Sequence, residues 1–383
     1  MAPGDPREPG PARRQRVAVV FGGRSSEHAI SCLSAGSVLR ALDRARYDVV
    51  PVGITPSGRW VLAPDDPEIL AIVGGVLPAV DSAGDAVALS LDPTSPGLMT
   101  AGGADVGALL AEVDVVFPVL HGPWGEDGTI QGLFELAGVP YVGSGVFASA
   151  AAMDKGHMKA LFAAAGMAQA PYVVLTERDW SADRAGSLAR VGELGSPVFV
   201  KPARAGSSVG ITRLALGAED GQDQLVDAIE HARTHDPRVV VEAAVVGARE
   251  VECGVLAGVD GVPRASVCAE IVVREGHEFY DFEAKYLEDA ADLIVPAQLA
   301  GDVAERVRAV AVQAFEALAC EGLARCDVFV RPDGEVLINE VNTMPGFTTI
   351  SMYPRMWAAS GVDFPELVDR LVQDAVRRGT GLR

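Results

Sequence analysis

The residues whose types and spacing most clearly suggest chemistry lie between Arg325 and Asn342. Two segments rich in Val, Ile and Phe flank Pro-Asp-Gly-Glu at 332–335, and Asp-Gly between such segments predicts a β-hairpin. If the turn is centred between positions 333 and 334, in a loop of two or four residues, Asp327 lies opposite Glu340 and Arg325 opposite Asn342. Because side chains alternate between the two faces of a strand, these four then project from one face.

An acidic pair across a hairpin needs a compensating charge. Carboxylates directly opposite each other repel and weaken the ladder, whereas Mg²⁺ binds carboxylate and amide oxygens and completes its coordination with water and substrate phosphates. Asp327, Glu340 and Asn342 therefore form a candidate metal site. The alternative is a solvated outer face of the hairpin. Arg325 and the Thr-Met-Pro-Gly segment at 343–346 favour a metal and anion site.

Lysine is rare in this chain, and its few positions are informative. Of the 32 basic side chains 28 are Arg and four are Lys, at Lys155, Lys159, Lys201 and Lys285. An ammonium is a compact charge that binds phosphate oxygens and can follow them as a loop closes. The sequence therefore predicts lysines at a phosphate site, with chance placement as the alternative. For Lys159 an ordinary surface position is the alternative.

The loop of small residues that follows Lys201 is a candidate phosphate lid. Backbone N–H groups of Gly206, Ser207 and Ser208 can approach an anion closely because no bulky side chain intervenes. The P-loop pattern Gly-x-x-x-x-Gly-Lys-Ser/Thr is absent, so the loop is not of that class. The alternative is a flexible hairpin tip, and Lys201 at the loop's entrance favours the lid.

Two further loops follow apolar strands and could line a site. The segment at 22–28 contains two glycines but not Gly-x-Gly-x-x-Gly, which argues against dinucleotide binding. Ser25 or Ser26 could cap the next helix, whereas Glu27 at a helix N-terminus could hold an ammonium group. The second loop, His-Gly-Pro-Trp-Gly-Glu-Asp-Gly, spans 121–128.

Composition excludes several classes of protein. The net charge of −20 argues against a nucleic-acid or anionic-membrane partner. The apolar stretch at 136–153 is broken by Gly and Pro, so no membrane span is predicted. Five Cys without metal-ligand spacing suggest structural thiols in a reducing cytosol. Residues 1–16, rich in Pro, Gly and Arg, are predicted to form a disordered extension.

The order of elements predicts an α/β and α+β architecture of several domains. Apolar strands at 17–21, 49–54 and 113–119, with a helix carrying Ala29, Cys32, Leu33, Val38 and Leu42, predict an N-terminal parallel α/β domain. Residues 64–107, low in aromatics, predict a partly ordered insertion. Later segments predict strands at 197–212, 239–242, 250–256 and 264–273 and a helix at 301–318. A length of 383 residues fits a division near 154 and 250, into 17–154, 155–250 and 251–383.

Four segments in this order resemble a known family. They are FGGRSSEHAIS from Phe21, HGPWGEDGTIQG from His121, KPARAGSSVG from Lys201 and NEVNTMPGFTTIS from Asn339. Each is moderately specific, and together they resemble the D-alanine–D-alanine ligases of the ATP-grasp superfamily over nearly the whole chain. The resemblance implies an ATP-grasp fold with an N-terminal substrate-binding domain, a central lid domain and a C-terminal catalytic domain.

The same resemblance implies an activity and its partners. The family joins two D-alanine molecules at the expense of ATP, through an acyl phosphate, for peptidoglycan precursor synthesis. It implies ATP and Mg²⁺ or Mn²⁺, with two ions, as cofactors. It also implies a cytoplasmic enzyme, most simply a homodimer, with D-alanine as both substrates and no nucleic-acid or membrane partner.

The resemblance assigns roles to individual residues. Asp327, Glu340 and Asn342 match the metal ligands. The nucleotide-binding positions, including the phosphate lysines, the lid, the adenine hinge and the ribose acid, are Lys155, Lys201, Ser207, Ser208, Val209, Glu242, Ala243, Val245, Glu250, Lys285 and Asn339. The catalytic positions are Glu27, Ser207, Tyr286, Arg325, Gly346 and Ser351.

Within this second group, Glu27 matches the residue that binds the first ammonium, in a hydrogen-bonded group with Ser207 and Tyr286. Arg325 and the Gly346 N–H match the stabilisers of the tetrahedral intermediate. Ser351 matches a ligand of the second carboxylate.

Three other functions compete with this interpretation. A ligase that uses D-lactate or D-serine as the second substrate is the nearest, and Tyr286 favours D-alanine. A non-catalytic ATP-grasp nucleotide-binding module is the second, and retention of Arg325, Glu340 and Asn342 argues against it. A nicotinamide oxidoreductase would need a glycine fingerprint that the chain lacks. The hinge at 242–245 lacks the bulky side chains common in the family.

Overall fold

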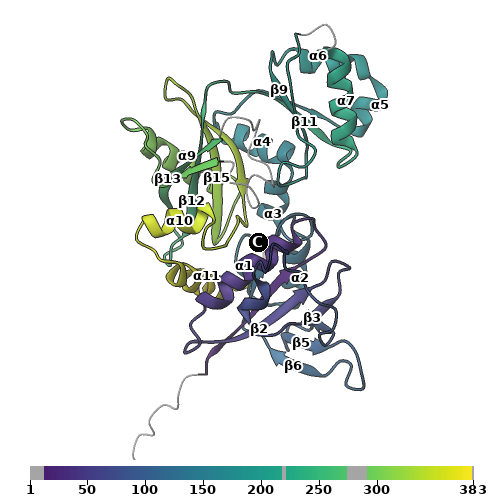
Figure 1. Ribbon diagram of the computed structural model, residues 1–383, viewed down its shortest axis with the longest axis vertical. Coiled ribbons are helices and arrows are strands. Elements are labelled where there is room, and N and C mark those ends of the chain that lie inside the picture. Colours follow the sequence, from purple (N-terminus) through teal and green to yellow (C-terminus); the bar gives the residue numbers. More distant parts are fainter. Residues whose placement is uncertain (1–12, 218–220, 274–290, 382–383) are drawn as a thin grey trace, which may run out of the picture.

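The computed structural model describes residues 13–217, 221–273 and 291–381, so the 1–12 part of the predicted extension lies outside it. The described elements form four sheets, distributed along three successive parts of the chain. In Figure 1 the N-terminal part lies at the bottom, the central part at the upper right and the C-terminal part at the left.

The N-terminal part is built on the predicted parallel sheet. Strands β2, β1 and β7 are parallel, with β3 antiparallel at the edge, in the order β3-β2-β1-β7. Apolar side chains of β1 and β7 pack under α1 in one core and under α2 in another. The bounds are β1 Gln15–Gly22, α1 His28–Ala41, β2 Tyr47–Ile54, β3 Trp60–Leu62, β7 Val115–Val119 and α2 Thr129–Ala137.

Gly22, at the end of β1, must be a glycine. Its φ is +89°, a left-handed conformation that side chains disfavour, and a Cβ there would lie 2.3 Å from the Ile54 carbonyl oxygen. The chain can therefore turn sharply out of the sheet and enter α1 close to the strand ends.

The predicted insertion at 64–107 is more regular than expected. Its Leu70 is buried against the core beneath α1, and its strands β4 and β5 join β6 in an antiparallel sheet. The alternating strand signal was weak because these strands are short. The bounds are η1 Pro67–Leu70, β4 Val87–Leu89, β5 Gly97–Thr100 and β6 Leu109–Glu112.

The central part is an antiparallel sheet, in the order β10-β9-β11-β8, covered on one face by helices. Apolar residues from α5, α6 and α7 pack with alternate residues of β9 and β11. The intervening residues, among them Lys201 and Glu242, therefore point to the opposite face. The bounds are β8 Tyr172–Leu175, α5 Glu177–Ala182, α6 Arg184–Gly192, β9 Val198–Pro202, β10 Thr212–Leu214, α7 Gly221–Arg233 and β11 Val239–Ala243.

The C-terminal part contains an antiparallel sheet in the order β14-β13-β12-β15-β16, with α9 on one face and α10 on the other. The predicted helix at 301–318 is confirmed as α9, whose buried residues include Val303, Val307 and Ala314. The bounds are β12 Arg249–Ala257, β13 Pro263–Val273, β14 Ala291–Ile294, α9 Val303–Ala317, β15 Leu323–Val330, β16 Val336–Asn342, α10 Met352–Ala359 and α11 Phe364–Arg378.

Some helices pack on a part of the chain other than the one to which they belong in sequence. α3 Val146–Met153 and α4 Lys155–Ala164 contact β16, and their apolar residues belong to the C-terminal core. α11 packs on α1 and β7 of the N-terminal part. We propose the domain boundaries near 154 and 250 because they separate the sheets almost completely, with β12 beginning at Arg249.

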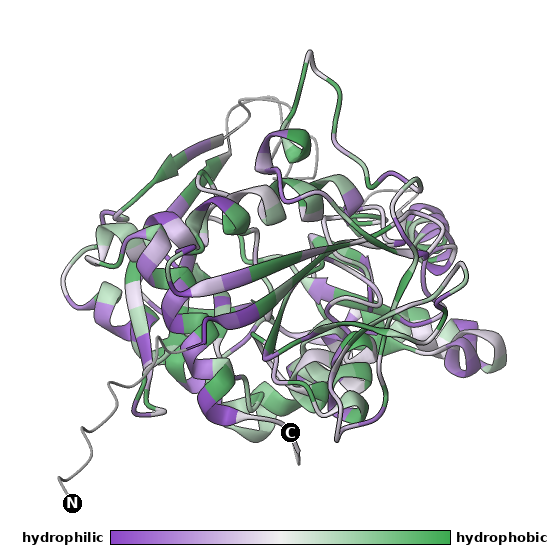
Figure 2. Ribbon diagram, turned by 90° about the horizontal axis from the view of Figure 1, so that it is seen from below, coloured by the Kyte–Doolittle hydropathy of each residue, from purple (hydrophilic) through white to green (hydrophobic). Residues whose placement is uncertain are grey.

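Apolar residues of the strands form the cores, and Figure 2 shows hydrophobic residues along many strands and a mixture of hydrophilic and hydrophobic residues along the helices. The five cysteines are buried and form no disulfide, as expected for structural thiols. In the described ranges no helix is long and apolar enough to cross a bilayer.

Candidate active site

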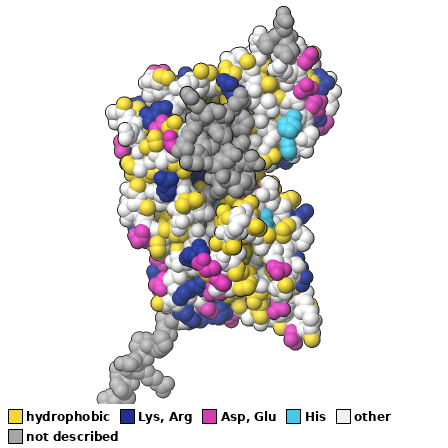
Figure 3. All heavy atoms as spheres, viewed as in Figure 1, with side chains coloured by type: hydrophobic (Ala, Val, Ile, Leu, Met, Phe, Trp, Pro, Cys, Tyr) yellow, Lys and Arg dark blue, Asp and Glu magenta, His cyan; other side chains and the backbone are white. Residues whose placement is uncertain are grey.

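A cavity of about 290 Å³ lies where the three parts of the chain meet. Figure 3 shows the surface hollowed between the upper right and lower parts. The cavity wall contains most residues assigned from the sequence, namely Glu27, Lys155, Lys201, Ser207, Ser208, Glu242, Ala243, Val245, Glu250, Arg325, Asp327, Asn339, Glu340, Asn342 and Gly346.

The hairpin β15–β16 has the predicted pairing, with Asp327 opposite Glu340 and Arg325 opposite Asn342. The predicted loop length was wrong, because the strand residues nearest the turn pair one position out of the expected register. A bulge at Asn339 restores the register and contributes Asn339 to the cavity wall. The acidic pair therefore depends on the bulge as well as on the turn.

A guanidinium compensates the carboxylates on this face. Arg325 donates two hydrogen bonds of 2.7 Å to the Asp327 carboxylate, and its Nε lies 3.3 Å from Glu252 Oε1. Burial lowers the pKa of Arg325, but Asp327 and Glu252 outweigh burial and raise it well above its usual value. The sequence analysis missed Glu252, which follows Glu250 on the same face of β12.

The side chains of this wall fit a hard cation. Asp327 and Glu340 offer carboxylate oxygens and Asn342 an amide oxygen, the donors that Mg²⁺ prefers. The Asn342 amide also donates to Asp327 Oδ2 at 3.1 Å, which orients it beside the carboxylate. The described residues contain no cluster of three His, Cys, Asp or Glu for a metal, so water and substrate oxygens would have to complete the coordination.

Lys155 begins α4 and reaches toward the hairpin. Asp154 caps α4 by accepting hydrogen bonds from the Gly156 and His157 N–H groups. Lys155 Nζ donates to the Ala205 carbonyl at 3.0 Å and lies 3.7 Å from Glu340 Oε2. The start of α4 thus brings an ammonium between the loop of small residues and the metal-site wall.

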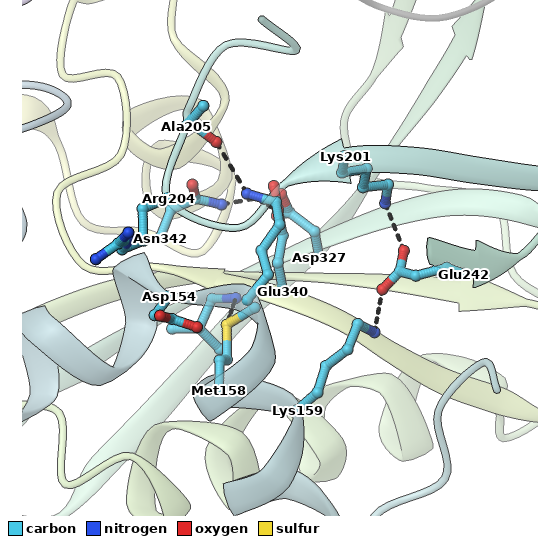
Figure 4. Close-up of polar contacts among 12 residues, drawn as sticks. Asp154, Met158, Lys159, Lys201, Arg204, Ala205, Glu242, Asp327, Glu340 and Asn342 are labelled. Carbon is cyan, nitrogen blue, oxygen red and sulfur yellow. Dashed lines mark hydrogen bonds and ion pairs between the residues drawn. The ribbon is translucent and has the colours of Figure 1, made fainter. Parts of the chain in front are cut away.

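Lys201 and Glu242 form a buried ion pair on neighbouring strands. Lys201 Nζ donates to Glu242 Oε2 at 2.5 Å, and Lys159 Nζ lies 2.5 Å from Glu242 Oε1 (Figure 4). The alternative of an ordinary surface position for Lys159 was wrong, since its side chain is 2% exposed. Burial raises the pKa of Glu242, but the two lysines outweigh burial and lower it to about 2.

The loop of small residues touches the N-terminal part. Ser207 Oγ donates to Glu27 Oε1, and Ser207 and Ser208 have φ values of +50° and +59°. Two successive residues in this disfavoured region indicate local strain, which is typical of functional loops. Both serines face the cavity, whereas Val209 does not line it and is 37% exposed.

Glu27, rather than Ser25 or Ser26, is the N-cap of α1, and its side chain makes no cap hydrogen bond. Ser25 Oγ accepts from the Glu27 N–H at 3.3 Å but does not occupy the cap position. Ser25 Oγ also donates to the His121 carbonyl at 2.7 Å, so the loop after β1 is attached to the loop after β7. Glu27 is left facing the cavity at the positive end of a helix, where an acidic side chain is stabilised.

His121 and Glu126 hold the segment that follows β16, which the sequence analysis did not foresee. His121 Nδ1 lies 3.1 Å from the Met344 carbonyl oxygen, and Glu126 accepts from the Met344 N–H at 3.3 Å. Burial and the charge of Glu27 raise the pKa of Glu126 to about 8. The two side chains fix the segment that places Gly346 in the cavity wall.

Of the assigned residues that the structure describes, Val209 and Ser351 do not line this cavity. Ser351 is the N-cap of α10, and its hydroxyl bonds to the Thr348 N–H and hydroxyl. Lys285 and Tyr286 lie outside the described residues.

Models of a known protein family match both the N-terminal and the C-terminal parts of the chain that line this site. Residues 16–144 match the family described as D-ala D-ala ligase N-terminus, and residues 161–373 match D-ala D-ala ligase C-terminus. The chain belongs to the D-alanine–D-alanine ligase family. The D-alanine–D-alanine ligases of Streptomyces griseus and Rhodococcus opacus are 56% and 58% identical to it, over 97% of this chain and 95% and 99% of theirs.

Solved structures of related ligases share the fold. The VanG D-Ala:D-Ser ligase from Enterococcus faecalis has a TM-score of 0.81 and 35% identity, covering 95% of this chain and all of its own. The D-alanine-D-alanine ligase from Coxiella burnetii has a TM-score of 0.77 and 32% identity, covering 95% of this chain and 96% of its own. The predicted ATP-grasp fold class is confirmed for this family member.

Proposed function

We propose that this chain is an ATP-dependent ligase that joins two D-alanine molecules to D-alanyl-D-alanine, releasing ADP and phosphate, for peptidoglycan precursor synthesis. The observation that carries the proposal is the gathering of Glu27, Arg325, two lysines and the predicted metal ligands around one cavity, in a chain related to D-alanine–D-alanine ligases over nearly its full length. The two lysines are Lys155 and Lys201.

The first half of the reaction activates a carboxylate. Glu27 binds the ammonium of the first D-alanine at the end of α1, while Lys155 and Lys201 bind ATP phosphates. A carboxylate oxygen of D-alanine attacks the γ-phosphorus, the bond to the β-phosphate oxygen breaks, and ADP leaves. The product is a D-alanyl phosphate, whose phosphate is a good leaving group. In this scheme Ser207 orients Glu27 through the hydrogen bond that the structure contains.

The second half forms the peptide bond. The amine of the second D-alanine loses a proton and attacks the acyl carbon, and phosphate then leaves from the tetrahedral intermediate. Arg325 and the Gly346 N–H stabilise the oxyanion that develops. Removing one such donor typically costs about 10²–10³ in rate. Ser351 is bonded to Thr348 outside the cavity wall, so we leave it without a role.

Asp327, Glu340 and Asn342 are the residues that would hold Mg²⁺ or Mn²⁺, with two ions as the family implies. A bound cation would supply positive charge against the phosphate oxygens. Arg325, which holds Asp327, keeps this wall from repelling an anionic nucleotide. The adenine would lie against the segment at 242–245 and the ribose near Glu250, both of which line the cavity.

D-Alanine is our choice of second substrate over D-serine and D-lactate. The D-Ala:D-Ser ligase VanG is 35% identical to this chain, whereas the D-alanine–D-alanine ligases are 56–58% identical. We also propose that the protein is cytoplasmic, because its five cysteines form no disulfide. The family suggests that it is a homodimer.

Steady-state ADP release with D-alanine, D-serine or D-lactate as acceptor, with the products identified by mass, tests the proposal. We expect D-alanyl-D-alanine to dominate, with activity rising toward alkaline pH because the acceptor amine must be deprotonated. A mixed product in which D-alanyl-D-serine or D-alanyl-D-lactate prevails would overturn the choice of acceptor. Absence of ADP release with every acceptor would overturn the enzymatic activity.

A further inference from the structure

Lys159 is a buried lysine that the proposed reaction does not use. It lies on α4, its side chain is 2% exposed, and it does not line the cavity. Its ammonium is 2.5 Å from Glu242 Oε1 and 5.4 Å from the centre of the Tyr172 ring. A charge buried this completely is costly even when paired, so an apolar residue would be the simpler filling for this position.

Glu242 connects this buried ammonium to the cavity. Its Oε2 accepts a hydrogen bond from Lys201, and its Oε1 forms an ion pair with Lys159. Figure 4 shows the three side chains in a row, with Glu242 between the lysines. Of the three, only Lys201 and Glu242 line the cavity.

The charges of this row are unequal. One carboxylate between two ammonium groups leaves a net positive charge, and Glu242 remains ionised because the lysines lower its pKa to about 2. Without Lys159, the full charge of Glu242 would be directed at Lys201. The Lys201 ammonium would then be neutralised by its own partner and would attract an anion less strongly.

We propose that Lys159 is a positioning residue for nucleotide binding: by sharing the Glu242 carboxylate from behind, it leaves the Lys201 ammonium with net charge for the phosphates of ATP. The inference rests on the proposed function, because it takes the anion at Lys201 to be a nucleotide phosphate. It predicts that Lys159 strengthens the binding of the phosphates and has much less effect on the binding of the base and ribose.

The test is calorimetric titration of the full-length protein with ATP and, separately, with adenosine. In Lys159→Met the affinity for ATP should fall about tenfold, as expected for one charge lost in a partly screened interior, while the affinity for adenosine stays nearly constant. In the double variant Lys159→Met/Glu242→Gln the row regains its net charge, and the ratio of the two affinities should return toward the wild-type ratio. Lys159→Arg, which keeps the charge, should retain most of that ratio.

Parallel losses of ATP and adenosine affinity in Lys159→Met would show a purely structural role and overturn the inference. The inference would also fail if the double variant did not recover the ratio. Both outcomes are distinguishable from failure of the proposed function, which would appear in the wild-type protein as absence of ATP binding or of ligation. Thermal melting of each variant without ligand shows whether it is folded and identifies variants that must be compared at lower temperature.

Discussion

Replacing Arg325 by Met should reveal how the acidic wall of the cavity is held together. Arg325 is 15% exposed and its partner Asp327 16%, and the guanidinium also lies 3.3 Å from Glu252. Methionine fills similar space but leaves these carboxylates, with Glu340 opposite Asp327, without their main counter-charge. The wall then carries several unshielded negative charges in a poorly solvated place.

The magnitude follows from burial. Removing one partner of a buried ion pair typically costs about 3–5 kcal/mol of unfolding free energy, and the residual exposure of both side chains favours the lower end. Turnover should fall about 10²–10³-fold from loss of the oxyanion donor. The same change should strengthen cation binding, because Asp327 is released from Arg325. Magnesium at 100 times its dissociation constant would raise the unfolding free energy of the variant by about 2.7 kcal/mol.

The assay is thermal melting in EDTA and at saturating Mg²⁺, with ADP release measured in parallel. Arg378→Met is the matched control: Arg378 is 10% exposed, pairs with Asp374 at 2.7 Å and does not line the cavity. Both variants should melt earlier in EDTA and gain stability with magnesium, but Arg325→Met, whose Asp327 is released, should gain more, and only it should lose turnover. Equal magnesium shifts in the two variants would refute competition between Arg325 and a cation for Asp327, and no shift in either variant would refute the cation site itself.

Three further predictions follow from the site. Glu340→Gln should abolish most activity while leaving the circular dichroism spectrum unchanged, and a near wild-type rate at low magnesium would contradict its role as a metal ligand. Backbone amides at 207–209 should gain hydrogen-exchange protection with a non-hydrolysable ATP analogue and magnesium; unchanged protection at saturation would exclude a lid. Because the pKa of Glu126 is raised to about 8, the folded protein should lose stability as pH rises from the ordinary carboxyl pKa toward 8. Glu126→Gln should therefore gain stability relative to wild type over that window, by up to about 1.4 kcal/mol per pH unit, and a pH-independent difference would exclude the raised pKa.

The β15–β16 hairpin shows which structural features local sequence signals can predict. Its alternating strands and turn residues predicted one face carrying Asp327, Glu340, Arg325 and Asn342 correctly. The prediction succeeded although the loop length was wrong, because the bulge at Asn339 compensated. A bulge depends on how β15 and β16 fit the neighbouring strands, and no pattern of apolar residues in one segment records that fit.

The burial of Lys159 is a feature that such local signals could not predict. In α4 it occupies a position that local pattern allows to be exposed, and its burial depends on Glu242, a residue of another element far along the chain. His121 and Glu126 are similar cases, because both act on the backbone of Met344. Long-range polar contacts of this kind leave no periodic signal, and only motif resemblance pointed to the loop that contains them.

The most direct test of the central claim follows the oxygen atoms of the first substrate. D-Alanine labelled with ¹⁸O in its carboxylate is incubated with ATP, magnesium and the full-length protein, and the phosphate and nucleotide products are analysed by mass. Phosphoryl activation predicts one ¹⁸O in the released phosphate for each dipeptide formed, with unlabelled ADP. Label in AMP, or unlabelled phosphate alongside dipeptide, would contradict activation through an acyl phosphate.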